Sequence, residues 1–324
     1  MRDVVYKTIV VKLPVLVPGG LCAPPTRVAC PCLVVLRADV QTLARCRGRG
    51  VILYLHGNGT DIGGAAEEAK TLARELDCHV VVPEYPGYGL AEGTPSEDSV
   101  DAVAHAAARF IEKTMGAPRD RVIIYGRSVG TGPAAAAAAR LSRGAFSGLE
   151  DDARSQNSQP ARNRNRASLS RTAPAALALH SPYTSIFDFA REKAGHVLSW
   201  LLVTERWPTM RNMTRVACPT LLIHGDCDEV IPARHSSRLR REAKRFPAPC
   251  QLHVQRGASH NVFDFFGDVA DPLATFLRRH ERAPWGKAGA RREPMGLDLR
   301  DLERKVRDAG EGDAEEYPFA DTGY

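Results

Sequence analysis

A serine between two glycines carries the strongest chemical signal in the sequence. Residues 126–130 read Gly-Arg-Ser-Val-Gly and lie between an apolar run at 122–125 and a helical pattern at 132–141. A serine on a sharp turn from strand to helix is exposed as a nucleophile, and the crowded, strained backbone there needs small neighbours. The N-terminus of the helix favours negative charge beside it. We therefore predict that Ser128 is a nucleophile; the alternative is a glycine-rich turn that matches the motif by chance.

Candidates for a base and an acid follow the serine in the chain. Serine hydrolases of the doubly wound class order these residues as serine, acid and histidine. An acidic loop with Asp226 and Asp228 follows the predicted strand at 220–223, and His260 follows the next predicted strand. Each therefore lies at the carboxyl edge of the sheet. We predict that His260 is the base, although a lone loop histidine is often only a surface residue, and the spacing leaves both aspartates open as the acid.

The negative oxygen of an acyl-transfer intermediate needs two N–H donors. We expect them to be the backbone N–H groups of Val129, which follows the serine, and of Asn58, in the loop after the strand at 51–55. Gly57 and Gly59 also match half of a dinucleotide-binding fingerprint, but the third glycine, Gly63, is one position late. The histidines show no metal-binding pattern. We predict neither a cofactor nor a metal.

Three tyrosines are candidates for lining a substrate pocket. Tyr85 and Tyr88 lie in the turn Glu-Tyr-Pro-Gly-Tyr-Gly after the predicted strand at 80–83, and Tyr183 follows another strand in His-Ser-Pro-Tyr. Both segments are expected at the edge of the sheet where ligands bind. A purely structural turn is the alternative for the first segment, and His180 and Ser181 of the second are expected to be structural.

Short apolar runs alternate with helical patterns along most of the chain. This arrangement predicts an α/β fold with a mostly parallel sheet covered by helices on both faces. The first two strands have no helix between them and are expected to form an antiparallel edge. The predicted strands are residues 8–13, 33–37, 51–55, 80–83, 122–125, 176–179, 220–223 and 251–255. The predicted helices are residues 65–76, 99–114, 132–141, 233–245 and 268–279.

Composition changes along the chain suggest one domain with two additions. We expect a single domain over residues 1–280, with a possible small cap at about 185–211. Residues 142–172 are rich in Ser, Arg and Asn and are predicted to be a disordered insertion. Residues 281–324 are predicted to be a charged, largely disordered tail containing one short amphipathic helix.

Length and charge exclude several classes of protein. The 324 residues are 44% hydrophobic and 25% charged, with a formal net charge of +6, too mild and too dispersed for a nucleic-acid binder. The eight cysteines lack zinc-site spacing and are too sparse for a disulfide scaffold, so a reducing compartment is expected. No apolar run approaches the roughly 20 residues that span a bilayer. The basic side chains at 234–245 indicate a solvent-exposed helix rather than one that binds an anionic membrane surface.

Six segments together resemble one known family. LYLHGNGTDIGG, VVVPEYPGYGLAEGTPSED, RVIIYGRSVGTGPA, LALHSPYTSI, LLIHGDCDEVIP and GASHN are similar, in this order, to the α/β-hydrolase domain 17 family of protein depalmitoylases, within the Bem46-like serine hydrolases. The resemblance runs from about residue 51 to 280, apart from the insertion. It implies an α/β-hydrolase fold with Ser128 as nucleophile, Asp228 as acid and His260 as base. The activity it implies is hydrolysis of palmitoyl thioesters on cysteines of membrane-associated proteins.

The sequence departs from this family near its start. Those depalmitoylases begin with a cysteine cluster that anchors them to membranes, whereas Cys22, Cys30 and Cys32 here are spread among prolines. We expect a cytoplasmic monomer acting on acyl esters or S-acylated proteins, with peripheral contact to the cytoplasmic face of a membrane left open. A general carboxylesterase or lipase, a serine peptidase and a non-catalytic binding protein of the same fold are the alternatives.

Overall fold

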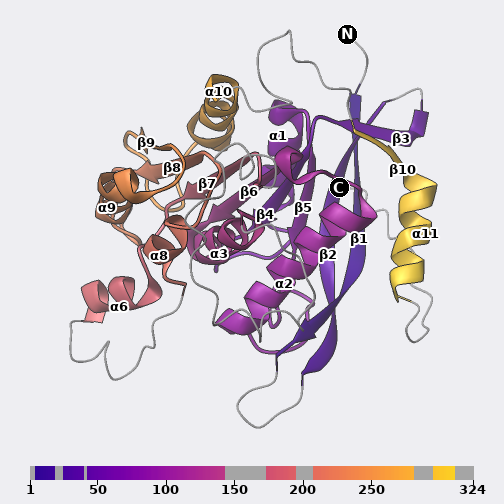
Figure 1. Cartoon of the computed structure of the whole chain (residues 1–324), viewed down its shortest axis with the longest axis horizontal. Helices are drawn as coiled ribbons and strands as arrows, with labels where there is room; N and C mark the ends of the chain where they lie inside the picture. The colour runs from indigo at the N-terminus through magenta and orange to yellow at the C-terminus, as the bar shows by residue number, and fades with distance from the viewer. Residues whose placement is uncertain are drawn as a thin grey trace, which may run out of the picture.

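One sheet runs through the described part of the chain (Figure 1). The computed structural model describes residues 4–18, 25–39, 42–142, 173–194, 207–280 and 295–310. Their strands are β1 (Val4–Val17), β2 (Thr26–Asp39), β3 (Thr42–Gly48), β4 (Val51–Leu55), β5 (His79–Pro83), β6 (Val122–Arg127), β7 (Ala176–His180), β8 (Thr220–Gly225), β9 (Cys250–Gln255) and β10 (Met295–Asp298). The order across the sheet is β10-β3-β2-β5-β4-β6-β7-β8-β9, and β1 pairs with β2.

The pairing directions confirm the predicted α/β fold class. Strands β5, β4, β6, β7, β8 and β9 pair in parallel, whereas β2 is antiparallel to β1, β3 and β5. Every residue of β4, β5, β7 and β8 is buried, as expected for strands covered on both faces. The carboxyl ends of β6, β8 and β9 therefore lie at one edge, where the predicted catalytic loops begin.

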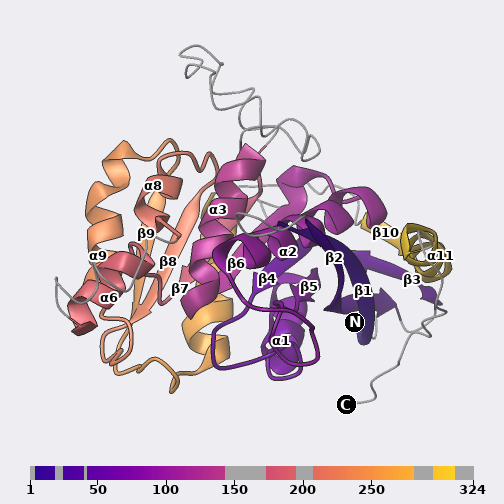
Figure 2. The ribbon, with the colours of Figure 1, turned by 90° about the horizontal axis from the view of Figure 1, so that it is seen from below.

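Helices cover both faces of the sheet (Figure 2). The helices α1 (Ala66–Leu76) and α10 (Asp271–Arg279) pack into one apolar core. The helices α2 (Glu97–Arg109), α3 (Thr131–Ser142), α8 (Thr209–Met213) and α9 (Arg234–Arg241) bury apolar residues in the other. No helix in the described ranges is long and apolar enough to cross a membrane.

Short irregular helical turns extend several of these helices. They are η1 (Phe110–Thr114), η3 (Ser128–Gly130), η5 (Glu242–Arg245) and η6 (Phe265–Ala270), whereas η2 (Arg119–Arg121) directly precedes β6. Helix α2 begins at a capping box, in which Ser96 and Ser99 each accept a hydrogen bond from the other's backbone N–H, at 3.1 and 2.8 Å. The predicted helix at 99–114 thus corresponds to α2 and η1 together.

The described part of the tail contains the predicted short helix and one further element. The helix is α11 (Leu299–Gly310), which lies beside the antiparallel edge in Figure 1, and it is preceded by β10, which pairs with β3 and was not predicted. A small apolar face holds both elements in place, because Met295, Leu297, Leu299 and Leu302 are all buried. The predicted insertion lies outside the described residues except for Ser142, and the predicted cap is described only at its two ends, which include α6 (Ile186–Ala194) and α8.

Candidate active site

Ser128 lies at the sharp turn between β6 and α3. Its φ of 53° is in the left-handed region, which residues with a Cβ rarely adopt. A Cβ on Gly130 would lie 2.1 Å from a backbone oxygen of β4, and one on Gly126 would lie 2.5 Å from the Gly130 oxygen. Both glycines of the motif are therefore required by close backbone approach, and the turn presents the serine at the carboxyl edge of the sheet.

Three predicted residues meet at this edge in one hydrogen-bonded chain. The Oγ atom of Ser128 is 3.0 Å from Nε2 of His260, and the Nδ1 atom of the same ring is 2.8 Å from Oδ2 of Asp228. Serine, histidine and carboxylate come from the ends of β6, β9 and β8. The ring is thus placed to take a proton from the serine while the carboxylate faces its other nitrogen.

The structure places Asp228, and not Asp226, beside the histidine. Backbone N–H groups of Val230 and Ile231 donate to Oδ1 of Asp228 at 3.0 and 2.8 Å and orient its carboxylate. Asp226 instead accepts the backbone N–H of Gly257 at 2.7 Å and braces the next loop. The choice that spacing alone left open is therefore made by the local hydrogen bonds of the acidic loop.

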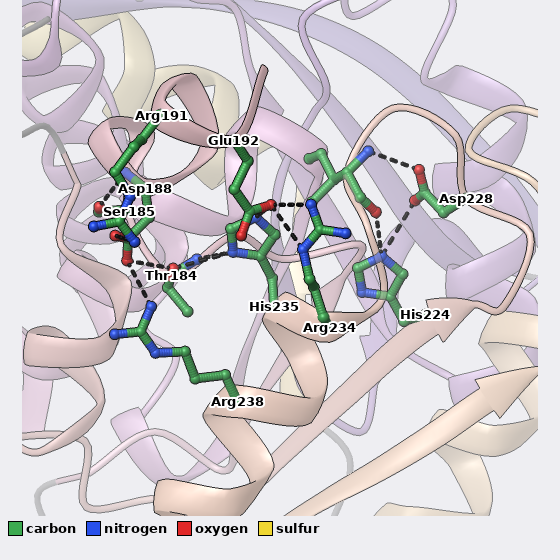
Figure 3. A network of polar contacts seen from close by, with 11 residues as sticks. Thr184, Ser185, Asp188, Arg191, Glu192, His224, Asp228, Arg234, His235 and Arg238 are labelled. Carbon is green, nitrogen blue, oxygen red and sulfur yellow. Dashed lines mark hydrogen bonds and ion pairs between the residues drawn. The ribbon is translucent and has the colours of Figure 1, made fainter. Parts of the chain in front are cut away.

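The carboxylate of Asp228 is buried but well supplied with hydrogen-bond donors. Ser181 Oγ donates to Oδ2 at 2.8 Å, and His224 Nε2 lies 3.3 Å from the same oxygen, as Figure 3 shows for His224. Burial opposes ionisation, yet the hydrogen bonds from His224, His260 and Ser181 outweigh it and hold the pKa of Asp228 well below its ordinary range. This residue stays an anion that can stabilise a charged His260.

The two expected oxyanion donors lie next to the serine. A Cβ on Gly57 would be 3.5 Å from the Cβ of Ser128, so the loop carrying Asn58 passes alongside the turn. Tyr88 donates a hydrogen bond to the Asn58 side chain and fixes that loop. Val129 lies at the start of a helix, where N–H groups have no intrahelical acceptor.

A cavity of about 230 Å³ opens beside these residues. Its lining is mostly apolar and consists of Asn58, Tyr85, Tyr88, Pro95, Ser96, Glu97, Val100, Val129, Pro133, Ile186 and Trp207. Two of the three predicted pocket tyrosines line it. Tyr183 does not, because its buried side chain points to the turn and its hydroxyl donates to the Val129 carbonyl at 3.0 Å.

Arg127 is a residue of the site that sequence reasoning missed. Its guanidinium lies 3.2 Å from Glu68 on α1, 3.4 Å from the His260 carbonyl and 3.5 Å from Asn261 Oδ1. It also stands over the ring of Phe263, 4.9 Å from the centroid. The residue before the serine thus contacts the loop that carries the histidine. The only signal in the sequence was its position inside the motif.

Two arginines of the basic segment pair with carboxylates. Figure 3 shows Arg234 with Glu192 and Arg238 with Asp188, which join α9 to α6 at distances of 2.7 and 3.2 Å. His235 adds a contact of 3.1 Å to Glu192. These pairs hold α6, an end of the predicted cap, against the domain.

In the described ranges no group of three or more His, Cys, Asp or Glu residues is arranged to hold a metal.

The sheet order and the turn at its carboxyl edge are those of the α/β-hydrolase fold class. A sequence profile of the Alpha/beta hydrolase family matches residues 52–278, and the chain belongs to that family. It is 30% identical over 226 residues to Alpha/beta hydrolase domain-containing protein aho-3 of Caenorhabditis elegans, and 28% identical to Alpha/beta hydrolase domain-containing protein 17B of Homo sapiens. Each match covers 70% of this chain, but only 57% and 65% of the relatives' own lengths.

Solved structures show the same fold at low identity. An alpha-beta hydrolase from Vibrio vulnificus matches with a TM-score of 0.56 and 16% identity, over 77% of this chain and 80% of that one. A puromycin-hydrolyzing peptidase of Mycobacterium tuberculosis matches with a TM-score of 0.54 and 18% identity, over 85% of this chain and 40% of the peptidase chain. The esterase Pf2001 of Pyrococcus furiosus matches with a TM-score of 0.54 and 14% identity, over 85% of this chain and 92% of the esterase chain.

Proposed function

We propose that this protein is a serine hydrolase that cleaves acyl esters and thioesters. The observation that carries the proposal is the hydrogen-bonded chain from Asp228 through His260 to Ser128 at the carboxyl edge of the sheet. A histidine between a hydroxyl and a buried carboxylate is the arrangement that activates a serine for acyl transfer.

In the proposed mechanism Ser128 Oγ attacks the carbonyl carbon while Nε2 of His260 takes its proton. The carbonyl oxygen becomes negative and accepts the N–H groups of Asn58 and Val129. The tetrahedral intermediate then collapses, and His260 returns the proton to the departing thiol or alcohol. Water, deprotonated by the same histidine, releases the acid and regenerates the serine. The anionic Asp228 stabilises the imidazolium in both halves of the cycle.

Thioesters of long-chain acids on protein cysteines are the proposed substrate class. Similarity to domain 17 hydrolases and the apolar lining of the cavity beside Val129 support this choice. A general carboxylesterase is the second candidate, and the same lining favours it equally. Comparing kcat/KM for an S-palmitoylated peptide with that for the matching O-acyl serine peptide separates the two.

Labelling with a fluorophosphonate probe tests the nucleophile. Ser128→Ala should lose all labelling, and its hydrolysis of p-nitrophenyl octanoate should fall by roughly 10⁴-fold or more because the serine and histidine act as a unit. Ser237→Ala, which changes an exposed serine on α9, is the matched control and should behave as wild type. Labelling that persists in Ser128→Ala would reject the assignment.

A further inference from the structure

Trp207 lines the cavity in a strained backbone conformation. Its side chain is buried, and its φ of 39° lies in the left-handed region. Such a conformation persists only where the surroundings hold it, and it tends to occur where a ligand is bound. The contacts around Trp207 must therefore hold its backbone in this conformation.

Two acidic side chains of α2 supply those contacts. Oε1 of Glu97 accepts the backbone N–H of Trp207 at 2.6 Å, and Oδ1 of Asp101 accepts its indole Nε1–H at 2.9 Å. On the opposite side the tryptophan packs against the first turn of α3, where a Cβ on Gly132 would lie 2.5 Å from the Cβ of Trp207. The indole is thus fixed from both sides and cannot swing out of the cavity wall without breaking these contacts.

The cavity that the indole borders has the chemistry of a site for an acyl chain. Val129, which carries an expected oxyanion donor, lies in the same lining as Trp207 and the apolar side chains of Val100 and Ile186. A volume of about 230 Å³ holds roughly eight methylene groups if each is taken as water-sized, at ~30 Å³. A palmitoyl chain would fill it with about half of its carbons.

We propose that Trp207, held by Glu97 and Asp101, is the specificity-determining wall of the acyl site and sets how many carbons of the chain are bound. This inference rests on the proposed hydrolase function of the same site. Each methylene removed from water is worth about fourfold in kcat/KM. This increase in kcat/KM ends where the acyl chain reaches the indole. Carbons beyond about the eighth therefore raise kcat/KM no further.

A chain-length profile tests the proposal. In wild type, kcat/KM for p-nitrophenyl esters from four to sixteen carbons should rise about fourfold per methylene and level off near eight. Trp207→Ala should move that plateau to twelve carbons or more, because removal of the indole lengthens the site. An unchanged plateau in a Trp207→Ala protein that labels normally with the fluorophosphonate would overturn the proposal.

A matched pair of valines covers the case in which Trp207→Ala does not fold. Val100 and Val103 are both buried on α2, but only Val100 lines the cavity. Val100→Phe should bring the plateau to shorter chains and lower kcat/KM for the eight-carbon ester at least tenfold, whereas Val103→Ala should keep the wild-type plateau. Equal profiles in both variants would refute the assignment. A wild-type protein that neither labels nor hydrolyses any ester would instead refute the proposed function.

Discussion

Asp101 makes the stability of this protein depend on pH in an unusual direction. Its carboxyl is largely enclosed between α2 and Trp207, and burial raises its pKa from an ordinary 3.8 to about 7. The hydrogen bond from Trp207 and the charge of Arg140 act against this rise, and the nearby charge of Glu97 adds to it. The folded protein therefore keeps a proton that the unfolded chain releases.

The size of the effect follows from linkage. A pKa of about 7 against 3.8 is a difference of about three units, and each unit corresponds to 1.36 kcal/mol. Because the folded pKa is the higher one, the stabilising contribution is fully present below about pH 4 and is lost as the pH rises to about 7. Over this pH range the raised pKa of Asp101 lowers the free energy of unfolding by up to about 4 kcal/mol.

Asp101→Asn removes the ionisation and keeps an oxygen that can accept the Trp207 Nε1–H. The free energy of unfolding of this variant, relative to wild type, should therefore increase by about 3 kcal/mol between pH 5 and pH 8. Urea denaturation at the two pH values measures it, with the m-value expected to stay constant. Asp98→Asn is the control, because Asp98 is exposed on the same helix and its loss should change stability by less than about 1 kcal/mol at either pH. If Asp101→Asn differs from wild type by the same amount at pH 5 and pH 8, the reasoning from burial is refuted.

Two further substitutions test how the candidate catalytic residues are positioned. Arg127→Ala should lower kcat by about 10- to 100-fold with little change in KM, because the loop carrying the histidine loses its contact with β6. Arg119→Ala removes an equally buried arginine that pairs with Glu112 on another part of the protein, and steady-state kinetics should show its kcat unchanged; an equal loss in both variants would contradict the positioning role. Ser181→Ala removes a hydrogen bond to Asp228 and should cost about 2 kcal/mol of unfolding free energy at pH 7, since the acceptor is charged. Unchanged stability in urea denaturation would show that this hydrogen bond contributes nothing.

The central strands were predictable because their burial leaves a direct mark on composition. Strands such as β4 and β8 are buried at every residue and appear as continuous apolar runs. Strands β3 and β10 were not predicted, because β3 carries two arginines among seven residues and β10 has only four residues. Their pairing depends on β10 returning from the far end of the chain, and no local pattern records that.

Local sequence also singled out Ser128 and His260, which the structure brings within 3.0 Å of each other, but it left the choice of acid open. The serine is marked by the glycines that its turn requires, and the histidine by its place after a strand. Asp226 and Asp228 stand two residues apart in one loop, and only the backbone N–H groups of that loop distinguish them by turning one carboxylate toward the histidine. The spacing of the two aspartates does not show which one faces the histidine. The resemblance of the motifs to a known family pointed to Asp228.

The contacts that shape the cavity connect residues more than a hundred positions apart. Trp207 is separated by 110 residues from Glu97 and by 106 from Asp101, and the Arg127 contact to His260 spans 133. Patterns of three to eight residues cannot reveal such pairs. The turn at Ser128 depends instead on glycines two residues away. A change at Trp207 leaves these glycines in place, so under the proposed function acyl-chain preference can vary while the turn that presents Ser128 is kept.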